Sequence, residues 1–285
     1  MPLAQNIDGN CPGWETFSAI CADSYNDISD PSIRTGYFQK VYCSPISTFS
    51  GHWGAMYCAD QDLNDNIEAI IVHRGTSNLP DVFQDIELFM NLCLQQIHAA
   101  RKFSQECFDF LYVRYKFNGE GRKDFLKRNK IWHTGHSLGG AISDIVSCLD
   151  FKSGSCTIDN PGSKDILAKY FNHYGPPIGH GGFVTLQTLP GFINTARTQM
   201  GDVYQMVNGP YSFDFINSDI VNIQKSISWN VFLNLWWVSF SINNHHIIPV
   251  YKSLQDFNNF PLISKIDFYP AGFREQPGCF SRVFR

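Results

Sequence analysis

The sequence lacks an apolar run long enough to cross a bilayer as a helix. Its longest such stretch, Ile227 to Ile242, falls short of the roughly 20 residues that a spanning helix needs, and asparagine and serine interrupt it. The N-terminal segment, Met1 to Asp8, has no basic region followed by an apolar core, so we expect no secretory signal peptide. We therefore expect a cytoplasmic protein, although export without a cleavable leader would leave no trace in the sequence.

An excess of charge of one sign is also missing. Lys and Arg number 22 against 26 Asp and Glu, which gives a formal net charge of −4, so nothing in the charge balance favours a nucleic acid as partner. No internal repeat, low-complexity tract or linker rich in Pro, Gly and Ser divides the chain. The sequence therefore predicts a single domain over residues 1–285.

Cysteine is present nine times, but neither the odd count nor the spacing suits a full set of disulfides or a zinc site. No two cysteines stand in C-x-x-C spacing, and mostly free thiols in a reducing compartment are the simplest interpretation. A metal site built from His173, His180, His245 and His246 would lack carboxylates at ligand spacing. We expect no metal ion and no organic cofactor.

Hydrophobic periodicity predicts strands that alternate with helices. Helical spacing covers residues 14–25, 92–115 and 138–149. Strand-like runs cover residues 55–59, 67–73, 130–134, 170–174, 203–207 and 211–216. This alternation predicts an α/β fold with a mainly parallel central sheet and helices on both faces.

The segment that carries chemistry is Gly135-His136-Ser137-Leu138-Gly139-Gly140. It contains G-x-S-x-G between a predicted strand and a predicted helix, which is the context that this motif requires. Such a turn exposes a serine hydroxyl at the start of a helix, where the next N–H, that of Leu138, can stabilise an oxyanion. We expect Ser137 to be a nucleophile; the alternative is a glycine-rich turn with a packing role only.

A second segment, His73-Arg74-Gly75-Thr76, follows the apolar run that ends at Val72. A strand that ends in glycine and a hydroxyl residue can bring a second N–H donor to an oxyanion. Taken alone, the segment is an ordinary strand end. Together with Ser137 it predicts that Thr76 and Leu138 form an oxyanion hole.

These segments resemble the class 3, or fungal-type, lipases of the α/β-hydrolase superfamily. In that family a strand ending in F-R-G-[ST] supplies the oxyanion hole and G-H-S-L-G-G carries the nucleophile. A third segment, His173-Tyr-Gly-Pro-Pro-Ile-Gly179, is similar to the F-G-x-P-x-x-G that follows the family's next strand. The resemblance runs from about residue 20 to residue 255 and implies an α/β-hydrolase fold with a Ser-Asp-His triad.

The acid of such a triad lies between the serine and the histidine in the chain. Asn217-Ser-Asp219-Ile-Val is similar to the family's V-N-x-x-D-x-V, with one residue fewer between Asn and Asp, and Asn222 replaces the usual proline. We predict Asp219 as the acid, with Asp214 and Asp202 as alternatives.

The base must come from the late histidine pair in Asn244-His245-His246-Ile. The family's histidine is followed five positions later by an aromatic residue, and Tyr251 has that spacing from His246. We therefore predict His246 as the base, with His245 as the alternative.

Two stretches bear on the substrate. Residues 79–94 have helical apolar spacing and stand where the resembling lipases have a lid, although a surface helix packed on the core would show the same pattern. Trp229, Trp236 and Trp237 lie between the proposed acid and base, and tryptophan favours membrane interfaces. Together they favour a lipid ester substrate, as for a lipase or phospholipase A, with transient contact at a lipid surface. The alternatives are an esterase for short acyl or aryl esters and a non-catalytic binding protein of the same fold.

Overall fold

The centre of the molecule is an eight-stranded sheet whose strands lie in chain order from β1 to β8. This computed structural model describes residues 12–25, 33, 35–44, 51–59, 66–75, 86–151, 153–175, 182–188, 198–207, 247–255 and 262–266. The strands are β1 Phe38–Cys43, β2 Gly54–Ala59, β3 Glu68–His73, β4 Lys130–His136, β5 Gly154–Ile158, β6 Phe183–Gln187, β7 Asp202–Val207 and β8 Leu262–Ile266.

The sheet is mixed, with a parallel middle. The first three strands pair antiparallel, β3 to β7 run parallel, and β8 closes the other edge antiparallel to β7. In the parallel part, Gly135 pairs with His73 on one side and Thr157 on the other. The carboxyl ends of β3, β4, β5 and β6 therefore meet at one edge, and the chain segments that follow these strands lie there together.

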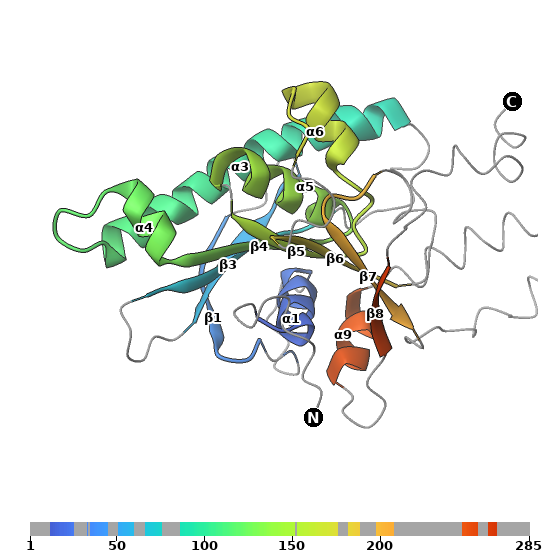
Figure 1. Ribbon diagram of the computed structural model, residues 1–285, viewed down its shortest axis with the longest axis horizontal. Helices are drawn as coiled ribbons and strands as arrows, with labels where there is room; N and C mark the ends of the chain where they lie inside the picture. The colour runs from blue at the N-terminus through green and yellow to red at the C-terminus, as the bar shows by residue number, and fades with distance from the viewer. Residues whose placement is uncertain are drawn as a thin grey trace, which may run out of the picture.

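Helices cover the two faces of this sheet, as the sequence predicts (Figure 1). On one face lie α3 Ile86–Tyr115, α4 Arg122–Arg128, α5 Leu138–Val146 and α6 Lys164–Phe171; on the other lie α1 Trp14–Ser24 and α9 Ile247–Gln255. A π-helical turn, Ser147–Phe151, continues α5. The apolar core is accordingly split into two layers by the sheet.

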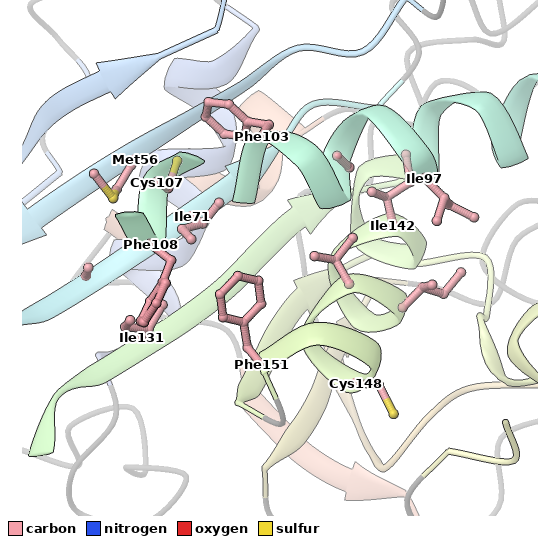
Figure 2. Close-up of a cluster of buried hydrophobic side chains, with 14 of the residues drawn as sticks. Met56, Ile71, Ile97, Phe103, Cys107, Phe108, Ile131, Ile142, Cys148 and Phe151 are labelled. Atoms are coloured by element: carbon pink, nitrogen blue, oxygen red, sulfur yellow. The ribbon is translucent and has the colours of Figure 1, made fainter. Parts of the chain in front are cut away.

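Each layer has its own set of buried side chains. Figure 2 shows the layer under α3 and α5, where Ile97 and Phe103 of α3 lie over Ile71 of β3 and Ile142 of α5. The opposite layer joins α1 and α9 to the other face of β3, β5, β6 and β7. The middle strands are buried on both faces, which accounts for continuous apolar runs such as that of β3.

The structure confirms most of the predicted elements and overturns one. Helices and strands occur at 14–24, 54–59, 68–73, 130–136, 138–146 and 202–207, close to the predicted bounds. The predicted helix at 92–115 begins earlier, at Ile86, so residues 86–94 are the first part of α3. The predicted strand at 170–174 is wrong, because α6 ends there at Phe171. Residues 211–216 lie outside the described residues.

The described cysteines and helices bear on two of the predictions from sequence. Cys21, Cys43, Cys58, Cys107 and Cys148 form no disulfide. In the described ranges, no helix combines the length and the apolar character needed to cross a membrane.

Candidate active site

Ser137 occupies the sharp turn between β4 and α5, at the carboxyl edge of the sheet. Its backbone has φ 58° and ψ −131°, a conformation that non-glycine residues rarely adopt. Its N–H donates to the carbonyl of Ile158 at 3.0 Å, and its own carbonyl accepts from the Gly140 N–H at 2.9 Å. The strained turn is therefore fixed to the neighbouring strand on one side and to α5 on the other.

Glycines allow β4, α5 and the end of β3 to approach one another closely. A Cβ on Gly135 would meet the backbone of Gly139 and, at 2.7 Å, the Gly140 nitrogen. A Cβ on Gly139 would meet the His73 carbonyl and, at 2.7 Å, the Gly75 nitrogen. Real Cβ atoms essentially never come within 3.0 Å of such neighbours. The glycines of the motif are therefore required by packing.

The same packing places backbone donors beside Ser137. Leu138 is the first residue of α5, so its N–H has no carbonyl partner within the helix and lies at the positive end of the helix dipole. Gly75 is held just as closely, because a Cβ there would stand 2.7 Å from both the His136 carbonyl and the Tyr25 hydroxyl. The next residue in the chain, Thr76, lies outside the described residues.

The residue before the serine, His136, is held by α1. Its Nδ1 lies 3.3 Å from the Tyr25 hydroxyl, and the two rings meet edge to face with centroids 5.7 Å apart. Burial raises the pKa of Tyr25 well above its usual value, so its hydroxyl stays protonated at neutral pH. The end of α1 thus supports the turn from the face opposite to α5.

A buried carboxyl group, that of Asp144, ties α5 to the next strand. It accepts hydrogen bonds from Ser155 Oγ at 2.5 Å, Asn160 Nδ2 at 2.6 Å and Ser163 Oγ at 2.8 Å. Burial raises the pKa of Asp144 to about 7, and the three donors oppose that rise. Helix α5, which directly follows Ser137, is therefore fixed to β5 and to the segment after it.

A second buried carboxyl group, that of Asp159, stands at the end of β5. Its backbone has φ 46°, and its N–H donates to the Leu186 carbonyl at 2.8 Å. Its carboxylate accepts from the Thr188 N–H at 2.8 Å and from the Thr188 hydroxyl at 2.9 Å. The group is held at the carboxyl edge of the sheet, next to the strand that carries Ser137.

A cluster of buried histidines lies beneath this edge. His73 Nδ1 is 3.0 Å from His52 Nε2, Ser104 Oγ is 3.3 Å from His73 Nε2, and the His73 and His133 rings stack with centroids 5.8 Å apart. Burial lowers the pKa of His52 to about 4 and that of His133 to about 3. Burial, with the neighbouring His52 and His133, also lowers the pKa of His73 well below its usual value. All three imidazoles are neutral at pH 7.

Comparison with known families agrees with the strained serine turn described above. Residues 70–159 match the model of the family described as lipase (class 3). The resemblance to class 3 lipases is confirmed. The matched segment, which we call the class 3 lipase segment, runs from β3 through the turn at Ser137 to Asp159. With a mixed sheet that is parallel from β3 to β7 and a strained G-x-S-x-G turn between strand and helix, the architecture is that of an α/β-hydrolase.

The solved structures that match this chain include two lipases from Rhizopus. The lipase from Rhizopus microsporus var. chinensis is 14% identical, with 67% of this chain and 72% of that chain covered and a TM-score of 0.46. Lipase II from Rhizopus niveus is 14% identical, with 68% and 79% covered and a TM-score of 0.36. Comparison with curated proteins gives no match.

The structure describes only some of the predicted site residues. Ser137 and Leu138 lie in the class 3 lipase segment. Thr76, Asp219 and His246 lie outside the described residues, as do the alternatives Asp214 and His245. The alternative acid Asp202 begins β7 and pairs with Val184, which places it toward the amino end of the parallel strands, away from Ser137.

The third motif, which begins at His173, does not follow the strand after the nucleophile strand, so that part of the sequence-based prediction is wrong. His173 follows helix α6, and its Nδ1 accepts from the Gly175 N–H at 3.0 Å. The strand after the nucleophile strand is β5, which is followed by Asp159-Asn-Pro161. In the described part of the chain, no group of three or more His, Cys, Asp or Glu is arranged to hold a metal ion.

Sequence reasoning also missed the two buried carboxyl groups, Asp144 and Asp159. Asp144 stands seven residues after the serine, within a helix where acidic residues are common on exposed faces. Asp159 follows a strand that apolar periodicity did not reveal. A useful signal would have been the polar cluster Ser155, Thr157, Asn160 and Ser163, whose burial requires partners.

Proposed function

We propose that this chain is a serine carboxylic ester hydrolase that cleaves lipid esters through an acyl-enzyme on Ser137. The observation that carries the proposal is the turn at Ser137, where a non-glycine residue is held at φ 58° at the head of a buried helix. Strain of this kind costs on the order of 1–3 kcal/mol and persists where function requires it. The match to class 3 lipases supports ester hydrolysis as that function.

The chemistry requires a base to remove the hydroxyl proton, because a serine hydroxyl is a weak nucleophile at neutral pH. His246 is the candidate base and Asp219 the candidate acid from sequence. The base takes the Ser137 proton as the oxygen attacks the ester carbonyl, and it then returns that proton to the departing alcohol. Water activated by the same base hydrolyses the acyl-enzyme. No step requires a metal or an organic cofactor.

Stabilisation of the oxyanion falls to the backbone donors at the edge of the sheet. The Leu138 N–H is the first donor, and the Thr76 N–H, one residue beyond the closely packed Gly75, is the second. Each donor contributes on the order of 3 kcal/mol to transition-state stabilisation in such sites. The close packing of Gly75 against His136 and Gly139 of the Ser137 turn supports this assignment, since oxyanion donors must be in place before reaction.

The experiment that tests the function is covalent labelling with a fluorophosphonate probe, followed by mapping of the modified residue. We expect one label on Ser137 and none in Ser137→Ala. As a matched control, Ser147→Ala changes a serine at the other end of α5 and should leave labelling intact. Labelling at another residue, or ester hydrolysis unchanged in Ser137→Ala, would contradict the proposal and favour a binding role for the fold.

A chain-length series of p-nitrophenyl esters separates lipid esters from short ones. We expect kcat/KM to rise from acetyl to acyl chains of eight or more carbons. A maximum at two to four carbons would leave the serine chemistry in place and assign the enzyme to short-chain esters instead.

A further inference from the structure

The carboxylate that orients the base for Ser137 must meet three conditions. It follows the serine in the chain, it lies at the carboxyl edge of the parallel strands, and it is itself held in place. Among the described residues after Ser137, the carboxyl groups belong to Asp144, Asp150, Asp159, Asp165 and Asp202. Only Asp159 directly follows the carboxyl end of a parallel strand.

The position of Asp159 next to Ser137 follows from the sheet register. His136 pairs with Ile158 across parallel β4 and β5, and the Ser137 N–H donates to the Ile158 carbonyl. Ser137 and Asp159 are therefore the first residues beyond two adjacent, directly paired strand ends. Their backbones leave the sheet side by side.

Backbone strain marks the same two residues. Positive φ occurs at three non-glycine residues of the described chain, Ser137, Asp159 and Asn172. Asn172 ends α6 in the left-handed conformation, which is common at helix C-termini. The other two lie beside each other at the edge where the reaction is proposed to occur, and strained residues concentrate at active sites.

The side chain of Asp159 is fixed as an orienting carboxylate requires. It is fully buried, and Thr188, itself buried at the end of β6, donates to it through both its N–H and its hydroxyl. The first residue of α9, Ile247, belongs to the same buried cluster as Ile158 and Leu186. In the sequence, α9 begins directly after the two candidate bases, His245 and His246. The residue that follows them therefore belongs to the buried layer that also contains Ile158, the neighbour of Asp159.

We infer that Asp159, and not Asp219, is the positioning residue that orients the base for Ser137. This rests on the proposed function, since it names the acid of the same site. Its carboxylate holds the imidazole in the tautomer that accepts the serine proton and stabilises the imidazolium that forms. Thr188 holds the carboxylate.

The test compares Asp159→Asn with Asp219→Asn in the full chain, with Asp124→Asn on exposed α4 as the control. Loss of an orienting carboxylate lowers kcat by up to about 10⁴-fold. We expect a loss of about 10³-fold or more for Asp159→Asn and less than about 5-fold for Asp219→Asn and Asp124→Asn. Because a carboxylate raises the pKa of a neighbouring imidazole, the acid limb of kcat/KM against pH should shift downward by about one unit or more in Asp159→Asn only.

Each outcome decides between the two acids. A large loss and a shifted acid limb in Asp219→Asn, with Asp159→Asn near wild type, would overturn the inference while fluorophosphonate labelling of Ser137 kept the proposed function. If circular dichroism shows that Asp159→Asn does not fold, Thr188→Val replaces it. That variant should lower kcat about 10-fold and shift the acid limb downward; unchanged kcat and pH profile in it would reject Asp159.

Discussion

Ser137 shows at the residue scale how function opposes local preference. Its φ of 58° and ψ of −131° suit glycine, yet a side chain is required there for chemistry. The strain is maintained by hydrogen bonds to Ile158 and Gly140 and by the close packing of α5. The six-residue motif made a turn at this residue predictable, because the glycines that the turn requires, Gly135 and Gly139, stand two positions to either side of the serine in the sequence.

Removal of the strain should be measurable as stability. Ser137→Ala keeps a Cβ at positive φ and Ser137→Gly does not, so we expect the glycine variant to be more stable by about 1 kcal/mol or more. Ser147, with φ −63° and ψ −36°, is the matched position, where alanine should be the more stable by up to about 1 kcal/mol. Urea unfolding of the four variants measures both differences. The same order of stability at both positions would show that the turn at Ser137 is not strained.

Asp159 was not predictable by the same route, since its role depends on a strand that lacks the usual apolar pattern. β5 reads Gly-Ser-Cys-Thr-Ile, and its buried hydroxyls at Ser155 and Thr157 are satisfied by side chains of other elements, Asp144 and Thr185. Partners of that kind are fixed only by the tertiary structure. The choice of Asp219 came from a family pattern and stays a prediction.

At the scale of elements, local patterns located the strongly apolar strands and the long helices but not the polar or aromatic ones. The predicted strand at residues 170–174 contains three aromatic residues, a residue type that is enriched in strands. In the structure Tyr170 and Tyr174 are exposed, at and just beyond the end of α6. The helical prediction for residues 92–115 succeeded because a long amphipathic period leaves little ambiguity.

The contact between α5 and the end of β3 is the element-scale feature on which the site depends. Gly139→Ala would force the new Cβ against the His73 carbonyl and the Gly75 nitrogen, which separates the two elements. We expect kcat to fall about 10- to 100-fold, because a displaced oxyanion donor loses much of its effect. The free energy of unfolding should fall by about 1–3 kcal/mol, although alanine is the better helix former.

Gly121→Ala is the matched control for this change. It stands before α4 at φ −81°, and a Cβ there has its nearest neighbour, Asp124 Oδ2, at 3.9 Å. Its kcat and free energy of unfolding should stay close to those of wild type. If Gly139→Ala behaved in the same way, the close approach of α5 to β3 would have no part in the chemistry.

On the scale of the whole molecule, the buried titratable groups should set the response of stability to acid. His52, His73 and His133 have folded-state pKa values below the ordinary 6.5. The unfolded chain therefore binds more protons below about pH 6.5, and stability falls as pH drops from there toward the folded-state values. Asp144, with its pKa raised to about 7, acts in the opposite direction, because its contribution is lost as pH rises through about 7.

The contribution of His133 to this pH dependence of the free energy of unfolding can be measured separately. Its ring stacks on His73 and lies near Phe151, and neither ring nitrogen has a hydrogen-bond partner in the described chain. His133→Phe keeps an aromatic ring and removes the proton, so the slope of unfolding free energy against pH between about 6.5 and 4 should lessen by about 1.4 kcal/mol per pH unit. Urea unfolding at half-unit steps of pH measures it, with His98→Phe on the exposed face of α3 as the control. Equal slopes in the two variants would mean that His133 takes up its proton without unfolding, and the acid response would then have to come from other groups.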